Sequence, residues 1–190
     1  TLWVSTVGEG IVKIILNKNG ITPTVKSATR IILDGGRLAS NYFFTSFQEN
    51  DSILWFGNRG YGAHRLNLET GKFTPYKFDN IVNSQMTNDI FAIYKNENGY
   101  WFATSSGLLH FNQEDSQHHN KVELLSKNTA HGILEDQQNN IWISTNQGLV
   151  RFNPKTHTSQ TYDRKNGLEV TEFSDGAFYK DIPTETLFFG

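Results

Sequence analysis

The sequence predicts an all-β protein built from β-propeller blades of four antiparallel strands, with about four repeats that form part of a larger, seven-bladed ring. Three observations predict this fold. Trp3, Trp55, Trp101, Trp142 and then Phe188 recur at intervals of 41 to 52 residues, and a glycine follows each tryptophan six or seven positions later. In addition, no segment keeps a helical apolar period over about eleven residues, so very little helix is expected.

The strand that carries the tryptophan is the clearest part of each repeat. The five aromatic residues lie in short runs of apolar and small residues at 2–5, 54–57, 100–103, 141–144 and 187–190. A small residue stands two positions after each aromatic one. Alternating large and small side chains suit strands whose two faces pack against neighbouring sheets. We therefore expect the four tryptophans to lie in the core between blades.

Three further strands complete each repeat. The second strand follows the glycine, which suits a tight turn because it adopts positive φ freely. In this second strand a basic residue or histidine precedes an apolar residue, as in Arg65-Leu66. Weaker patterns predict the third strand at 73–76, 122–125 and 159–162, and apolar runs predict the fourth at 42–47, 89–94, 131–134 and 176–179. Polar links at 48–52, 95–99 and 136–140 then form hairpin turns to the next tryptophan strand.

The domain organisation follows from the repeats. Residues 1–190 are predicted to be one partial propeller, with repeats centred on Trp3, Trp55, Trp101 and Trp142 and a truncated fifth repeat at Phe188. A solenoid is the alternative architecture. Because the chain starts inside one blade and stops inside another, the outermost strands would leave unpaired edges. Such edges pair readily with other chains, so we expect the isolated chain to self-associate.

Two segments, NIWISTNQGLVRFN at 140–153 and GYWFATSSGL at 99–108, resemble the two-component regulator propeller repeat. The similarity is looser around Trp55, where Asn58 replaces the usual threonine, and around Trp3, where the turn has an added residue. Residues 166–190 are similar to the last blade of such propellers, which precedes an immunoglobulin-like domain. A WD40 repeat is not supported, because the sequence contains no Trp-Asp dipeptide.

The resemblance implies a function in signalling. It implies that the chain belongs to the periplasmic sensor region of a bacterial membrane receptor, commonly a hybrid histidine kinase and sometimes a diguanylate cyclase. The segment would then be non-catalytic, with any kinase or cyclase output outside these residues. The alternative is a protein-interaction or dimerisation scaffold that relays a signal sensed elsewhere.

Composition excludes several other classes of protein. The chain has 17 basic and 19 acidic side chains, a net charge of −2 and no run of like charges, so neither nucleic acid nor an anionic membrane surface is an expected partner. It contains no cysteine, which excludes disulfides, thiolate metal sites and a cysteine nucleophile. No glycine loop for nucleotides and no nucleophile-elbow motif is present, so we expect neither a cofactor nor enzymatic activity.

Histidines and acidic residues are the side chains of this sequence that could bind a metal. His118 and His119 lie near His110 in the sequence, but their spacing fits no common ligand pattern, and residues 113–120 are typical of a solvated loop. Acidic residues of the turns, among them Asp136 and Asp175, are explained by turn propensity. No metal site is therefore expected.

The candidate ligand-binding residues are those that differ between repeats. Connections between blades and the turns after the tryptophan strands emerge on one face of a propeller, where ligands commonly bind. The variable residues there offer guanidinium, amide and hydroxyl groups beside aromatic rings, which suits a small molecule or oligosaccharide. Arg59 and Tyr61, in the most glycine-rich of these turns, are the first choice. The full candidate set is Arg59, Tyr61, Arg37, Tyr42, His131, Asn88 and Gln147.

Overall fold

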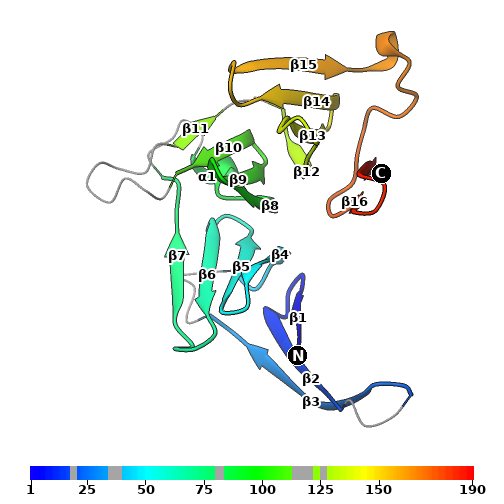
Figure 1. Cartoon of the computed structure of the whole chain (residues 1–190). Coiled ribbons are helices and arrows are strands. Elements are labelled where there is room, and N and C mark those ends of the chain that lie inside the picture. The colour runs from blue at the N-terminus through cyan, green and yellow to red at the C-terminus, as the bar shows by residue number, and fades with distance from the viewer. Residues whose placement is uncertain (18–20, 34–39, 80–83, 113–121, 125–127) are drawn as a thin grey trace.

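The computed structural model describes residues 1–17, 21–33, 40–79, 84–112, 122–124 and 128–190, which form five antiparallel sheets (Figure 1). The first sheet contains β1 (Leu2–Ser5), β2 (Ile11–Asn17) and β3 (Thr24–Ile31). The second contains β4 (Phe43–Asn50), β5 (Ile53–Asn58), β6 (Ala63–Asn67) and β7 (Phe73–Tyr76). The third contains β8 (Ile90–Asn96), β9 (Gly99–Thr104), β10 (Gly107–Phe111) and β11 (Val122–Leu124).

The last two sheets differ in size. The fourth contains β12 (Ala130–Glu135), β13 (Ile141–Thr145), β14 (Gly148–Asn153) and β15 (Thr158–Tyr162), and the fifth contains β16 (Phe178–Asp181) and β17 (Thr186–Phe189). In the described residues, helix is limited to the four-residue α1 (Ser84–Thr87) and one 3-10 turn (Arg164–Asn166). The predicted all-β class, the four-stranded blades and the very low helix content are therefore confirmed.

The sheets are offset by one strand from the repeats expected from the sequence. The strand that precedes each tryptophan strand, which the sequence groups with the previous repeat, pairs with the tryptophan strand through the predicted hairpin: Phe47 lies opposite Trp55, and Tyr94 opposite Trp101. The reason is local, because the short polar links close antiparallel hairpins. Strand β3 was not predicted, because nearly all of its side chains are exposed and show no apolar alternation.

The glycines after the tryptophan strands are required by the turns. Gly148 has φ 116°, and a Cβ there would lie 2.3 Å from the carbonyl oxygen of Tyr162 on the next strand. Gly62 has φ 75°, and a Cβ would lie 2.1 Å from the carbonyl oxygen of Tyr76. Both the backbone conformation and the close approach of the outer strand therefore exclude any side chain.

The first strands of consecutive sheets lie side by side. Strand β4 contacts β8, β8 contacts β12 and β12 contacts β16, whereas β3, β7 and β15 lie at the periphery (Figure 1). We call β4, β8, β12 and β16 the inner strands. This order places the connections between sheets and the turns after the tryptophan strands at one end of the inner strands, and the hairpins before the tryptophan strands at the other end.

Only two of the four tryptophans are fully buried between sheets. Trp55 and Trp101 are 0% and 1% exposed, and the ring of Trp55 lies 4.8 Å from that of Tyr100 in the next sheet. Trp142 is half-buried and stacks on Tyr162 of its own sheet, because the fifth sheet has two strands and covers only part of this face. Trp3 is also half-buried. The expectation that all four form the core holds for the two central ones.

Polar contacts join neighbouring sheets at the hairpin end of the inner strands. Glu49, at the end of β4, accepts hydrogen bonds from Trp55 Nε1 (2.7 Å), from Lys95 Nζ (2.6 Å) and from Tyr100 Oη (2.8 Å), the last two in the third sheet. Burial raises the pKa of the Glu49 carboxyl, but these three donors outweigh it and hold the pKa below its usual range. The charged carboxylate is therefore the form that stabilises this joint.

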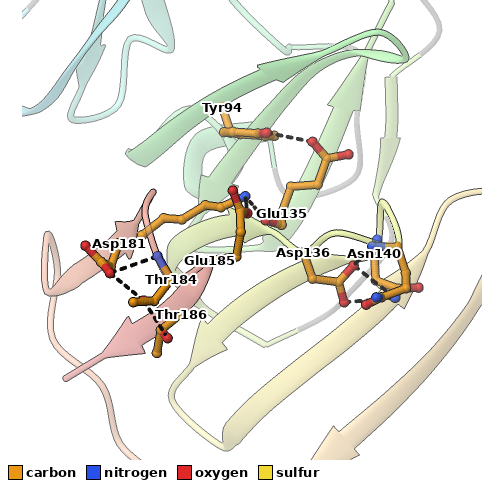
Figure 2. Close-up of polar contacts among 10 residues, drawn as sticks. Tyr94, Glu135, Asp136, Asn140, Asp181, Thr184, Glu185 and Thr186 are labelled. Atoms are coloured by element: carbon orange, nitrogen blue, oxygen red, sulfur yellow. Dashed lines mark hydrogen bonds and ion pairs between the residues drawn. The ribbon is translucent and has the colours of Figure 1, made fainter.

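The same kind of joint recurs one sheet further on. Figure 2 shows Tyr94 of β8 pointing toward Glu135 of β12, to which its hydroxyl donates at 2.6 Å. Asn96 donates to the same carboxylate at 2.9 Å, and Lys180 of β16 donates to the Glu135 carbonyl oxygen at 3.2 Å. Burial and the neighbouring Glu135 raise the pKa of Tyr94. Each joint thus links one inner strand to the next.

Candidate functional site

Three inner strands carry a β-bulge at the same place. The pairing register skips Phe44 in β4, Phe91 in β8 and His131 in β12, so each is an extra residue opposite the tryptophan strand. A bulge bends a strand and redirects a side chain, and bulges are common next to binding sites. The three bulged residues lie at the end of the inner strands where the connections between sheets emerge.

The bulged residues form a continuous row. The ring centroids of Phe44 and Phe91 are 5.0 Å apart, and those of Phe91 and His131 are 5.9 Å apart. His131 Nδ1 lies 2.6 Å from Asp175 Oδ1, in the connection that leads to β16. We call Phe44, Phe91, His131 and Asp175 the inner row. It takes one residue from each of three consecutive inner strands, and its fourth member from the connection that leads to the fifth sheet.

Arg59 and Tyr42 lie together beside the inner row, as a pair of candidate residues from separate loops. The Arg59 N–H donates to the carbonyl oxygen of Tyr42 at 3.0 Å, and the guanidinium lies 5.9 Å from the Tyr42 ring centroid. Tyr42 is 41% exposed and stands two residues before Phe44 in the chain. Buried Asn58 fixes this corner, because its amide exchanges hydrogen bonds with Ser40.

The other candidates occupy different environments. Tyr61 is half-buried, with the Lys77 ammonium 4.8 Å from its ring. Asn88 is 2% exposed; its side chain accepts from the Phe78 N–H and donates to Asp79, so its amide supports the connection rather than offering a free surface. Gln147 is exposed in the turn between β13 and β14. Arg37 lies outside the described residues.

Of the inner row, the sequence predicts only His131 as a candidate site residue. The sequence predicts Phe44 and Phe91 only as strand residues and Asp175 as an ordinary turn residue. A signal was present: an apolar residue, then an aromatic residue or histidine, then a small residue recurs at 43–45, 90–92 and 130–132. Recognising it required knowing that the middle residue is bulged and faces its equivalents in neighbouring sheets.

The chemistry of this region suits recognition. Two half-buried phenyl rings offer apolar faces, the imidazole and carboxylate of His131 and Asp175 offer hydrogen-bonding atoms, and the Arg59 guanidinium adds planar donors. Such a combination matches a ligand that carries both C–H faces and hydroxyl groups.

The described residues contain neither a metal-ligating cluster nor a membrane-spanning helix. Within the described ranges, no group of three or more histidine, aspartate or glutamate side chains is arranged to hold a metal ion. His118 and His119 lie outside those ranges. In the part of the chain that the structure describes, no helix has the length and apolar character needed to cross a bilayer.

The family comparison agrees with the resemblance noted in the sequence. Residues 124–147 match the model of the two-component regulator propeller, which confirms the predicted repeat in the region of β12 and β13. No curated protein matches the chain.

Solved structures support the same fold. The extracellular domain of a protein described as the hybrid two-component system BT3049 of B. thetaiotaomicron is 21% identical, with a TM-score of 0.67 over 99% of this chain. That of BT4673 from the same organism is 18% identical, with a TM-score of 0.73 over 99% of this chain. The chain spans about a quarter of these domains, 23% and 26% respectively. It therefore has the fold of part of these extracellular domains.

An enzyme shares the architecture as well. A catalytically inactive variant of virginiamycin B lyase from Staphylococcus aureus aligns over 94% of this chain and 52% of its own, at 13% identity and a TM-score of 0.59. At such identity the likeness shows the fold alone. Function must accordingly be argued from the residues of this chain.

Proposed function

We propose that this chain is a non-catalytic ligand-recognition segment of the periplasmic sensor region of a bacterial two-component receptor. The observation that carries the proposal is the inner row, in which equivalent bulged positions hold Phe44, Phe91 and His131, and His131 contacts Asp175 in the connection to the fifth sheet. The propeller repeat and the sensor domains of similar fold support the signalling context.

The proposed ligand is a small polyhydroxylated molecule or an oligosaccharide. Its C–H faces would pack on Phe44 and Phe91, while hydroxyl groups would bond to His131, Asp175 and Arg59. The imidazole is oriented by its bond to the carboxylate, which leaves Nε2 directed away from Asp175. The region thus offers recognition without a nucleophile.

A thermal-shift screen of the intact sensor region against saccharides tests this proposal. A ligand at about 100 times its dissociation constant should add about 2.7 kcal/mol to the free energy of unfolding. Phe91→Leu and His131→Gln should each reduce the response, while Phe188→Ala, an exposed ring on the fifth sheet, should keep it in full. No stabilisation by any saccharide, or a response unchanged in both row variants, would contradict the proposal.

A scaffold function is the second candidate, and exposed sheet faces favour it. Tyr179 and Phe188 lie opposite each other in the fifth sheet and are 62% and 53% exposed, and Leu2 and Val4 are exposed on β1. In the central sheets, the positions equivalent to Phe188 hold Trp55 and Trp101, which pack on the next sheet. We propose that the isolated chain self-associates through these faces and edges. Light scattering tests it: a Phe188→Lys variant should shift the mass toward the monomer, and a monomeric wild type at high concentration would refute it.

A further inference from the structure

A groove separates the third and fourth sheets at the hairpin end of the inner strands, opposite the inner row. Its volume is about 300 Å³. One wall comes from the turn after β8 and from strands β9 and β10, with Glu97, Asn98 and His110. The other comes from β14 and the turn that follows it, with Phe152 and His157. None of these residues belongs to the inner row.

The His110 wall is rigidly built. The imidazole of His110 stacks on Trp101, with ring centroids 4.1 Å apart and planes at 24°. Its Nε2 lies 2.7 Å from the carbonyl oxygen of Asn98; because a carbonyl oxygen only accepts, Nε2 carries the proton in this contact. The half-exposed imidazole therefore covers the buried indole and presents a fixed planar surface at the groove.

The opposite wall contains an unusual backbone conformation. His157 has φ 54°, in the left-handed region that a side chain rarely adopts. The equivalent turn of the second sheet has Gly71 at φ 70°, and the two turns otherwise agree, since Asn67 and Asn153 each accept from backbone N–H groups two and three residues later. The fourth sheet therefore keeps a strained histidine where glycine would be relaxed. Non-glycine residues with a left-handed backbone conformation are concentrated at functional sites in proteins.

We propose that this groove is a second binding site, for one uncharged, hydroxyl-bearing ring of about the size of a pyranose. The ring of His110 provides a surface for C–H groups, beside the edge of the largely buried Phe152, and the Glu97 carboxylate, the Asn98 amide and the His157 imidazole supply acceptors and donors for hydroxyls. The residues that line the described groove include no lysine or arginine and include one carboxylate, which disfavours an anionic ligand. The left-handed backbone of His157 is strained, and the imidazole that it carries lines the groove.

Histidine NMR tests the site. In the intact sensor region, methyl α-D-glucopyranoside, methyl β-D-galactopyranoside and methyl N-acetyl-β-D-glucosaminide are titrated separately, and the ring C–H signals of His110 and His157 are followed. At least one should shift both signals in a saturable way. His157→Gly, which restores the glycine of the equivalent turn, should unfold at higher urea concentration than the wild type and bind about tenfold more weakly.

A second glycine variant and an anion titration serve as controls for the groove. Glu185→Gly relaxes another left-handed residue, φ 56°, in the fifth sheet and should bind like the wild type. A response to sodium sulfate with none to the glycosides would overturn the proposal in favour of an anion site. Unshifted signals with every probe, or unchanged affinity in His157→Gly, would also overturn it. The His131 signal in the same spectra reports the inner row, so failure of one site is distinguishable from failure of the other.

Discussion

The two ends of the inner strands differ in how far neighbouring sheets repeat each other. At the hairpin end an acidic residue near the end of an inner strand joins two sheets in both places: Glu49 accepts hydrogen bonds from the next sheet, and Glu135 accepts them from the preceding one. At the connection end the bulge recurs, but its residue changes from Phe44 and Phe91 to His131. We infer that the carboxylate contacts that recur between sheets hold the blades together. A bulged position that is repeated but holds a different residue indicates a binding site instead.

The largest expected effect on the free energy of unfolding comes from a tryptophan that packs between two sheets. Trp101→Ala should lower the free energy of unfolding by about 3 to 5 kcal/mol, because the ring is buried between two sheets. Trp142→Ala, expected from the sequence to be equally severe, should lower it by about half as much, because its ring is half-buried. Urea unfolding of both variants measures the difference. Equal losses would mean that Trp142 is covered in solution to the same extent as Trp101.

The next effect concerns the joint at Glu49. Glu49→Gln removes the charge that accepts from Lys95, Trp55 and Tyr100, so we expect a loss of about 1.5 to 3 kcal/mol. Glu9→Gln is the matched control, since its ion pair with Arg30 is exposed and should contribute less than about 1 kcal/mol. Urea unfolding at neutral pH gives both values. A Glu49→Gln variant as stable as the control would show that the joint contributes little to assembly.

The pH dependence of stability should reflect the carboxylates at the hairpin end of the inner strands. The pKa values of Glu49 and Asp136 are lowered in the folded protein, because hydrogen bonds to the charged carboxylates outweigh burial. Their contribution is therefore present above the unfolded pKa values of about 4 and is lost as the pH falls through the lower folded values. Urea midpoints should decline below about pH 4, and less steeply in Glu49→Gln. An identical decline in the variant would remove Glu49 from the acid response.

The sequence predicted the repeating part of the molecule well. The regular spacing of tryptophan and glycine reflects local structural requirements, such as the turn at Gly148 that leaves no room for a Cβ. Such requirements can be recognised in a single sequence. Strand β3 escaped prediction because its exposed residues carry no burial pattern. The inner row escaped because it depends on contacts between Phe44, Phe91 and His131, which are about 40 or more residues apart in the chain and meet only when blades pack side by side.

The smallest expected effect on stability concerns the turn between β5 and β6. Arg59 is exposed and Tyr61 half-buried, and their cation–ring contacts are with Tyr42 and Lys77 at the surface. The Arg59→Ala, Tyr61→Ala double variant should therefore change the free energy of unfolding by less than about 0.5 kcal/mol. In the intact receptor it should weaken the response to a ligand that binds the inner row, because the guanidinium and the phenol supply donors and a ring face beside that row. Dose–response curves of a signalling reporter measure this effect, with Lys72→Ala, an exposed residue in the turn at the other end of β6, as the control. A normal response by a well-folded double variant would confine the site to the inner row, and a large loss of stability would show that the two residues support the fold instead.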